Sequence, residues 1–235
     1  FHVAMQGRPG PVVLSIPEDV LSATSSVADA APATTIDAAP SAQQMADVRR
    51  LLQQAQRPLV IVGNLGWNVE AASRFRTFVE QNNLPVVAGF RSQDVLDNRS
   101  EQYIGDISLG CSRPLMARVK TADLLLVIGD RLGDVTTNHY SLFDVPTPKQ
   151  ALIHVFPGPE ELGRVYVPTL GIPPNSSRFA EALAQLDPLD HSSWDAWRAE
   201  SRLAYVEYQA PRPDFPPFDL AKVIDHLNTA LPDDA

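Results

Sequence analysis

The chain has 235 residues, 44% of them hydrophobic, which is enough for one sizeable core with tails. Its 19 basic and 28 acidic side chains leave a formal net charge of −9, which argues against a nucleic-acid or anionic-membrane surface, because both need clustered lysine and arginine. The longest unbroken apolar run, residues 124–128, is far too short to cross a membrane. Cys111 is the single cysteine, which excludes an internal disulfide and agrees with a reducing cytoplasm.

The first forty residues contain one strand-like segment and one linker. Residues 12–16 have the composition of a buried strand, and Pro17 ends it because proline donates no hydrogen bond to a neighbouring strand. No earlier segment could pair with this strand, and the chain begins with Phe1 rather than methionine. We therefore interpret residues 1–20 as the tail of a preceding domain. Residues 21–40 are small, polar and aperiodic, which is typical of a linker.

Strands and helices alternate between residues 41 and 188. Continuous apolar runs predict strands at 58–63, 84–88, 124–128, 151–156 and 165–170. Helical spacing of apolar residues predicts helices that begin at Ser41, Asn68, Ser112 and Asn175. This rhythm predicts an α/β fold, a Rossmann-like doubly wound parallel sheet with helices on both faces.

The pattern changes after Pro188. A helix is predicted over 193–208, a second linker over 211–217, and a further helix from Asp219, so we divide this part into a helix and linker (189–217) and the start of another domain (218–235). The first helix carries an aromatic stripe, which we interpret as a surface that packs against a neighbouring domain and is exposed without it. The stripe consists of Trp194, Trp197, Tyr205 and Tyr208.

The segment Gly7-Arg8-Pro9-Gly10-Pro11-Val12-Val13, followed by Ile16-Pro17-Glu18-Asp19-Val20, resembles the close of the first domain in thiamine diphosphate-dependent enzymes of the acetolactate synthase, benzoylformate decarboxylase and pyruvate oxidase group. The resemblance extends over nearly the whole chain. It implies a parent with pyrimidine-binding, central and diphosphate-binding domains, of which this chain holds the central one, a Rossmann-like sheet of about six strands, with its flanking linkers.

The same resemblance implies the chemistry of the parent. Thiamine diphosphate and Mg²⁺ would be bound by the pyrimidine- and diphosphate-binding domains outside this chain, and the substrate would be a 2-keto acid that is decarboxylated or joined to another carbonyl. The parent would be a homo-oligomer. No catalytic residue and no metal ligand is assigned within the chain, and we expect it to be inactive by itself.

Three loops form a candidate nucleotide crevice. Gly63 and Gly66 join a predicted strand to a helix, where a helix N-terminus can bind a phosphate, although such a glycine pair also suits a plain turn. Phe90 and Arg91 follow the next strand, in a loop that resembles the family segment near the active site or flavin. Residues 128–134, with Gly129 and Arg131, resemble a family segment whose arginine reaches a flavin dinucleotide. The alternative is that Arg131 forms an ion pair with a nearby acid.

One departure from the family pattern bears on FAD or ADP as a ligand. Residues 154–160 match the position of the family's His-Ile-Asp-Ile-Asp-Pro-Glu, but Phe156 and Gly158 stand where the family has aspartates. A carboxylate is the usual acceptor for ribose hydroxyls in such folds. The sequence therefore leaves open a free-standing FAD- or ADP-binding Rossmann module, a central domain with a vestigial nucleotide site, and a domain that only spaces its neighbours.

Three other features have plain interpretations. His139 has no ligand-like spacing to its neighbours and is predicted on a surface loop. Cys111 has no base near it in sequence and is predicted to be a small buried side chain. Gly105 and Gly110 are predicted in tight turns.

Overall fold

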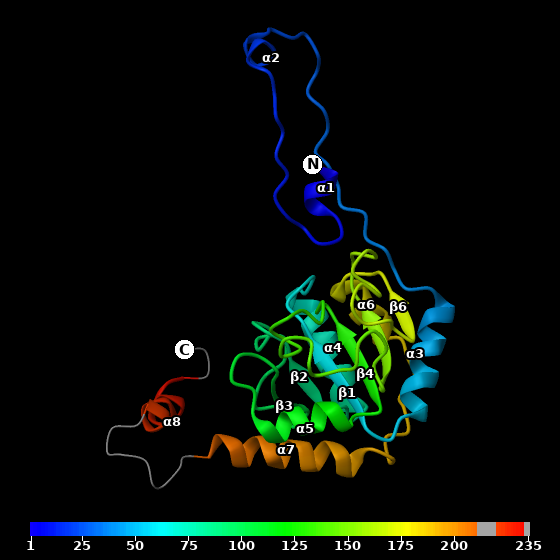
Figure 1. Ribbon diagram of the computed structural model, residues 1–235, viewed down its shortest axis with the longest axis vertical. Coiled ribbons are helices and arrows are strands. Elements are labelled where there is room, and N and C mark those ends of the chain that lie inside the picture. Colours follow the sequence, from blue (N-terminus) through cyan, green and yellow to red (C-terminus); the bar gives the residue numbers. More distant parts are fainter. Residues whose placement is uncertain (211–219, 233–235) are drawn as a thin grey trace.

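A parallel sheet lies at the centre of the computed structural model, which describes residues 1–210 and 220–232 (Figure 1). Its strand order is β3-β2-β1-β4-β5-β6, and every neighbouring pair runs parallel. The order reverses between β1 and β4: the chain leaves β1 toward β2 and β3, then returns to β4 on the other side of β1. Ligands of such sheets bind beside this reversal, at the carboxyl ends of the strands. The strands are β1 (Pro58–Val62), β2 (Val86–Ala88), β3 (Tyr103–Asp106), β4 (Leu124–Ile128), β5 (Ala151–Val155) and β6 (Leu170–Ile172).

The helices begin where the sequence predicts them, because a side-chain oxygen caps each first turn. Ser41 and Gln44 form a reciprocal capping box, and the side chain of Asn68 accepts a hydrogen bond from the amide of Ala71 at 2.8 Å. Ser112 and Asn175 cap the other two helices in the same way. The four helices are α3 (Ala42–Gln54), α4 (Val69–Gln81), α5 (Arg113–Thr121) and α6 (Ser176–Leu183).

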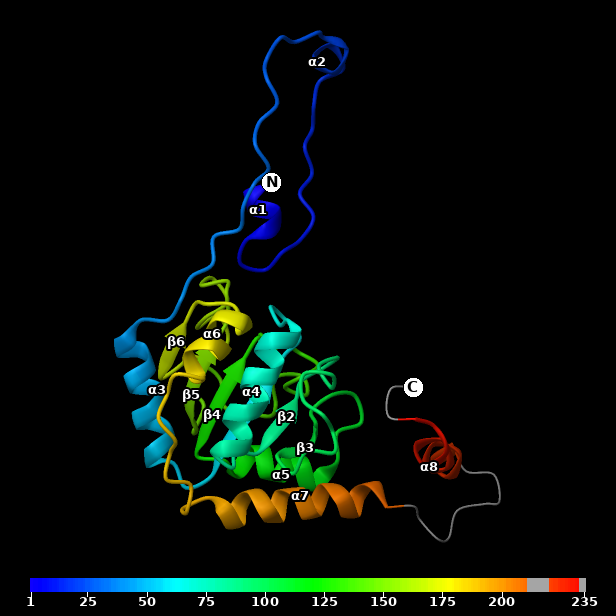
Figure 2. The same cartoon turned by 180° about the vertical axis from the view of Figure 1, so that it is seen from behind.

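The helices cover both faces of the sheet. Helices α4 and α6 pack against each other, and Figure 2 shows α4 lying over the strands. The connection through α5 runs from β3 back to β4, opposite in direction to the one through α4, so a right-handed crossover places α5 on the other face. The strands β1 and β4 are buried along their whole length, as expected for strands covered on both sides. The predicted doubly wound α/β fold is confirmed.

Two strands differ from the prediction. Strand β3 was missed, because Gly105 interrupts its apolar run and the segment was interpreted as a turn; Gly105 adopts a φ of +121° inside the strand. Strand β6 lies at 170–172 rather than 165–170, because the side chain of Tyr166 turns into the core and packs edge-on against the ring of Phe143. Both strands are short and at the edges of the sheet, where the hydrophobic pattern is weakest.

The connection from β4 to β5 contains no helix. Residues 129–150 form a long loop, and three of its side chains are buried, namely Leu132, Thr137 and Leu142. Three consecutive residues, 138–140, have left-handed backbone conformations with φ between 48° and 57°. His139 lies in this turn with its side chain exposed.

The N-terminal segment extends away from the sheet and contains the short helices α1 (His2–Met5) and α2 (Glu18–Ser22) (Figures 1 and 2). Residues 12–16, predicted as a strand of a preceding domain, form no strand in this structure, and Val13 is 90% exposed. A strand needs a hydrogen-bonded neighbour, and none lies beside this segment. Residues 23–40 have no regular structure, and Asp37 contacts Asn175 at 3.0 Å.

Helix α7 (Asp195–Gln209) packs along the β3 side of the sheet, next to α5 (Figure 1). The indole nitrogens of Trp194 and Trp197 donate to the carbonyls of Asn82 and Pro58 at 3.1 and 3.0 Å, and both rings are buried. The prediction that these tryptophans form a surface for another domain is therefore wrong, because they complete the core of this one. Of the predicted stripe, Tyr208 is exposed.

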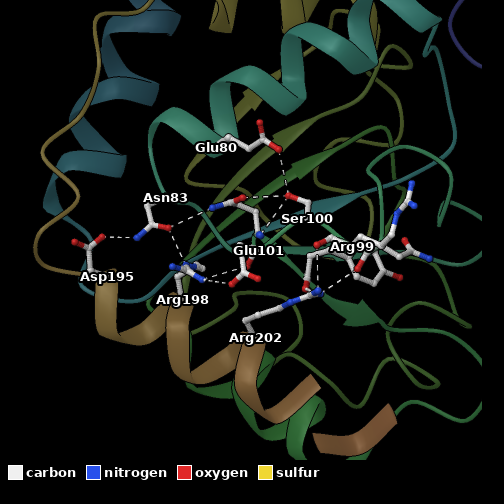
Figure 3. A network of polar contacts seen from close by, with 11 residues as sticks. Glu80, Asn83, Arg99, Ser100, Glu101, Asp195, Arg198 and Arg202 are labelled. Atoms are coloured by element: carbon white, nitrogen blue, oxygen red, sulfur yellow. Dashed lines mark hydrogen bonds and ion pairs between the residues drawn. The ribbon is translucent and has the colours of Figure 1, made fainter. Parts of the chain in front are cut away.

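A polar network fixes α7 in place (Figure 3). Arg198 donates to the side chains of Asn83 and Glu101 at 2.7 and 3.1 Å, and Asn83 in turn donates to Asp195 at the start of the helix. Arg202 donates to the carbonyls of Asn98, Arg99 and Tyr103 at 3.0, 3.2 and 2.8 Å. The first half of the helix, from Asp195 to Arg202, is thus joined by side chains to Asn83 and to residues 98–103.

The last described element is α8 (Leu220–Ala230), which is amphipathic and exposed. The predicted linker at 211–217 and the predicted helix start at Asp219 lie outside the described residues. Within the parts that are described, no helix is both long and apolar enough to cross a membrane.

Candidate functional site

A cleft of about 450 Å³ opens at the carboxyl edge of the sheet, beside the reversal of strand order. Four residues of the predicted crevice come together in it, namely Phe90, Arg91, Gly129 and Arg131. The ends of β1, β2, β4 and β5 and the N-terminal segment all contribute to its lining. The remaining lining residues are Arg8, Asn64, Leu65, Asp130, Gly133, Asp134, Val135, Thr136 and Phe156.

The two glycines after β1 have different positions. A methyl group added at Gly63 would overlap the carbonyl of Gly129, so the two backbones are tightly packed; Gly129 lines the cleft and Gly63 does not. Gly66 does not line the cleft. Its carbonyl accepts hydrogen bonds from the amide and hydroxyl of Ser177 at 2.9 and 2.7 Å. The start of α6 thus packs on the turn that was a candidate phosphate site, and the alternative of a plain turn describes Gly66 better.

The guanidinium groups at the cleft differ in their partners. Arg131 lies 4.0 Å from Glu161, and the same carboxylate is paired more closely with Arg164 at 3.0 Å. The alternative of an ion pair for Arg131 is therefore present in a loose form, with an acid of a neighbouring loop. Arg91 has a left-handed backbone at φ +60°, and its guanidinium lies over the ring of Phe90, 5.0 Å from the centroid.

Asp130 lies at the bottom of the cleft as a buried carboxylate. Its oxygens accept hydrogen bonds from the amide of Leu132 at 2.6 Å and the hydroxyl of Thr136 at 3.1 Å. Gly89 is required beside it, because a methyl group at Gly89 would overlap the carboxylate. Burial raises the pKa of Asp130 above its ordinary value, which favours the uncharged form. The carbonyl of Asp130 also accepts from Nε2 of buried His154 at 2.8 Å.

The fit of an adenine nucleotide can be tested on these residues. The ring of Phe156 is buried against the cleft at the end of β5, where a carboxylate would meet ribose hydroxyls. The end of β2 presents Arg91 rather than an acid, and the buried carboxyl group of Asp130 accepts hydrogen bonds from Leu132 and Thr136. Gly158 lies next to the N-terminal segment: a methyl group added at Gly7 would lie 3.6 Å from the Cα of Gly158. The cleft therefore does not fit FAD or ADP held through the ribose.

Cys111 and His139 lie outside this cleft, along a separate hollow of about 220 Å³. Cys111 is half-buried rather than fully buried, and burial raises its thiol pKa to about 11, which makes it unreactive. His139 contacts Asp134 at 3.1 Å and is solvent-exposed. Among the residues that the structure describes, no group of three or more His, Cys, Asp or Glu side chains is arranged to hold a metal ion.

Sequence reasoning missed two parts of the cleft. Arg8 lies far from the other lining residues in sequence, so no local pattern connects it with them. Its Gly-Arg-Pro-Gly-Pro context is the available signal, because a distinctive loop is a candidate for a site. Thr136 was missed because a hydroxyl beside a buried carboxylate has no spacing signature.

Residues 45–183 match the family model described as the thiamine pyrophosphate enzyme, central domain. The chain belongs to this family. The match covers the sheet from α3 to α6 and stops before α7, which nevertheless packs into the same core. The predicted family relationship is therefore confirmed, and the family name implies thiamine diphosphate in the parent protein.

Curated relatives of this thiamine pyrophosphate enzyme domain are longer proteins. The chain is 29% identical over 181 residues to the acetolactate synthase large subunit of Corynebacterium glutamicum, with 73% of the chain and 28% of that protein covered. It is 29% identical over 191 residues to the acetolactate synthase isozyme 1 large subunit of Escherichia coli (80% and 33% covered). It is 28% identical over 175 residues to the glyoxylate carboligase of Escherichia coli O157:H7 (73% and 29% covered). The chain thus spans about a third of the length of these relatives.

Proposed function

We propose that this chain is the central part of a thiamine diphosphate-dependent enzyme that decarboxylates a 2-keto acid and joins the product to a second carbonyl compound. The observation that carries the proposal is the family match over residues 45–183, together with relatives named acetolactate synthase and glyoxylate carboligase. When bound, thiamine diphosphate supplies the carbanion chemistry, and the protein orients the reactants and excludes water.

The chain's own residues have a supporting role in this proposal. Among the described residues we assign no catalytic group, and none of their acidic clusters fits Mg²⁺. Residues 1–20 and 218–235 would join the central sheet to a pyrimidine-binding and a diphosphate-binding domain, which hold the cofactor. The fixed position of α7 supports this role, because the side chains of Arg198 and Arg202 set the direction in which the chain leaves the sheet.

The oligomeric state and the cellular location also belong to the proposal. A homo-oligomeric parent is supported by the family resemblance, and a reducing, cytoplasmic location by the single cysteine. We do not extend the proposal to FAD or ADP, because Phe156 removes the ribose acceptor and α6 covers the glycine turn. A domain that spaces its neighbours is therefore favoured over a free-standing nucleotide-binding module.

The test is an assay of the full-length protein with thiamine diphosphate and Mg²⁺. Pyruvate and glyoxylate are supplied as 2-keto acids, and released carbon dioxide and the carboligation product are measured. We expect turnover that requires the cofactor, and no turnover or cofactor-induced thermal shift for residues 1–235 alone. Full-length protein that binds the cofactor yet leaves a panel of 2-keto acids unchanged would contradict the proposed reaction. A clear thermal shift of the 235-residue chain would contradict the assignment of the cofactor to other domains.

A further inference from the structure

The linker before α3 is attached to the sheet domain by a contact that we call the clasp, formed by Asp37, Asn175 and Arg178. One carboxylate oxygen of Asp37 accepts a hydrogen bond from Nδ2 of Asn175 at 3.0 Å, and the other lies 3.8 Å from Nε of Arg178. Residues 23–32 of the linker are exposed and have no regular structure. Figures 1 and 2 show the linker passing beside α6 and β6 on its way to α3. The clasp is therefore the point at which the linker meets the domain.

Asn175 is held in the orientation that the clasp needs. Its side-chain oxygen accepts a hydrogen bond from the amide of Arg178 at 2.8 Å as the N-cap of α6, which leaves its Nδ2 group to donate to Asp37. The first turn of α6 is itself fixed on the sheet, because the hydroxyl of Ser177 donates to the carbonyl of Gly66 at 2.7 Å. A carboxylate at this end of a helix also meets the positive end of the helix dipole.

The clasp lies at the end of a chain of ion pairs across two helices. Arg178 pairs with Glu181 of α6 at 3.0 Å, and Glu181 lies 3.7 Å from Arg74 of α4. Arg74 pairs in turn with Glu70 at 2.5 Å. A single exposed ion pair contributes little to stability, but charges in a network restrain one another. Arg178 therefore offers Asp37 a guanidinium whose position is already restrained.

Two stretches of the N-terminal segment meet beside the clasp. Residues 5–7 and 35–38 line a hollow of about 340 Å³, together with Gly66 and Pro157 of the sheet domain. Among the described residues that line it, Asp37 has the one charged side chain. Apolar contacts have no preferred direction, so the charged contact at Asp37 decides how residues 35–38 lie. These residues then form one side of the hollow that residues 5–7 also line.

We propose that Asp37 is a positioning residue, which holds residues 35–38 at the start of α6 and so places residues 5–7, and the domain before them, against the sheet. The preceding domain is part of the proposed function, and to that extent the inference rests on it. Asp37 acts through Asn175 and Arg178 and takes no part in the chemical step. Without the clasp, the N-terminal segment moves independently of the sheet, while the sheet domain itself stays folded.

The test measures a distance in the full-length protein by pulsed electron paramagnetic resonance. Spin labels are attached after Val3→Cys, close to residues 5–7, and Lys120→Cys, at an exposed position on α5. Cys111 reacts slowly because its thiol is half-buried, and any other reactive cysteine is replaced by serine. We expect one narrow distribution of distances between the labels. A broad distribution in this protein, which retains the clasp, would overturn the proposal.

Exchanging the donor and the acceptor identifies the contact. Asn175→Asp still caps α6, because aspartate is an equally good N-cap, but it repels Asp37 and cannot donate to it. It should lower the ratio of the narrow to the broad component by about tenfold, as the loss of a hydrogen bond to a charged acceptor predicts. Combining Asp37→Asn with Asn175→Asp places a donor opposite an acceptor again, and should restore the narrow distribution.

Two single variants complete the test. Asp37→Ala removes the acceptor without touching α6 and should broaden the distribution as Asn175→Asp does. Asp29→Asn is the matched control, an exposed acid of the same linker, and should leave the distribution narrow. An unchanged distribution in Asp37→Ala, or a double variant that stays broad, would refute the clasp. None of these measurements uses turnover, so a full-length protein that leaves 2-keto acids unchanged would contradict the proposed reaction and not this inference.

Discussion

Replacing Arg202 by methionine tests whether α7 is part of the domain or only a connector. The guanidinium of Arg202 donates to three backbone carbonyls of the 98–103 segment and lies 5.1 Å from the ring centroid of Tyr205. Methionine keeps the aliphatic contacts but removes all the hydrogen bonds. The carbonyl of Tyr103 is part-buried and would lose a donor, whereas those of Asn98 and Arg99 can turn to water.

The magnitude follows from this difference in burial. A hydrogen bond from a charged donor to a part-buried acceptor contributes about 1.5–3 kcal/mol, and the two exposed ones add little. We therefore expect Arg202→Met to lower the free energy of unfolding by about 2 kcal/mol, which corresponds to about 4–8 °C in Tm for a domain of this size. Urea unfolding followed by circular dichroism measures it. The matched control is Arg178→Met, an exposed arginine on α6, for which no change is expected.

Two results would refute this reasoning. If Arg202→Met unfolds at the same urea concentration as the wild-type protein, the three hydrogen bonds do not hold α7 in solution. If Arg178→Met loses as much stability as Arg202→Met, the loss reflects the removal of any arginine rather than this contact.

Three further predictions concern the core and the cleft. Burial lowers the pKa of His154 below its ordinary value of 6.5, so the unfolded chain binds this proton more tightly and the free energy of unfolding should fall as the pH drops below 6.5. His154→Gln, which keeps a donor for the carbonyl of Asp130, should reduce the loss between pH 7.5 and 5.5 in urea unfolding; an equal loss in both proteins would contradict this. Cys111, with a pKa of about 11, should react with Ellman's reagent at pH 7.5 many times more slowly than free cysteine does, and reaction at a similar rate would show that the thiol is not buried. Gly63→Ala should lower the free energy of unfolding by about 3 kcal/mol, the upper end of the cost of overpacking, because its methyl group overlaps the Gly129 backbone; a variant with wild-type Tm would disprove that close approach.

The sequence predicted the parts of this structure whose physical cause is local. The runs at β1 and β4 are apolar because both faces of those strands are covered, and the helix starts are visible because Ser41 and Asn68 cap them with their own side chains. Strand β3 was missed because its place in the sheet comes from pairing with β2, which overrides the local preference of Gly105 for a turn.

The candidate cleft was predictable to a similar extent. Phe90, Arg91, Gly129 and Arg131 follow strand ends, and parallel strands bring their carboxyl ends to one edge. The absence of Gly66 from the cleft depends on α6, which approaches from far along the chain and could not be inferred locally. The burial of Trp194 was missed for the same reason, because an aromatic stripe does not indicate which surface it will cover.

The hydrogen bonds of Arg202 also bear on whether another chain can pair with the edge of the sheet. The carbonyl of Gln102 accepts from the amide of Val86 on β2, so the next carbonyl, that of Tyr103, faces the open side of β3, where another chain could add a strand. Arg202 occupies this carbonyl at 2.8 Å, and α7 lies alongside. At the opposite edge, β6 is only three residues long and has α3 beside it. Both margins of the sheet are thus closed to intermolecular strand pairing, and truncation before α7 would uncover one of them.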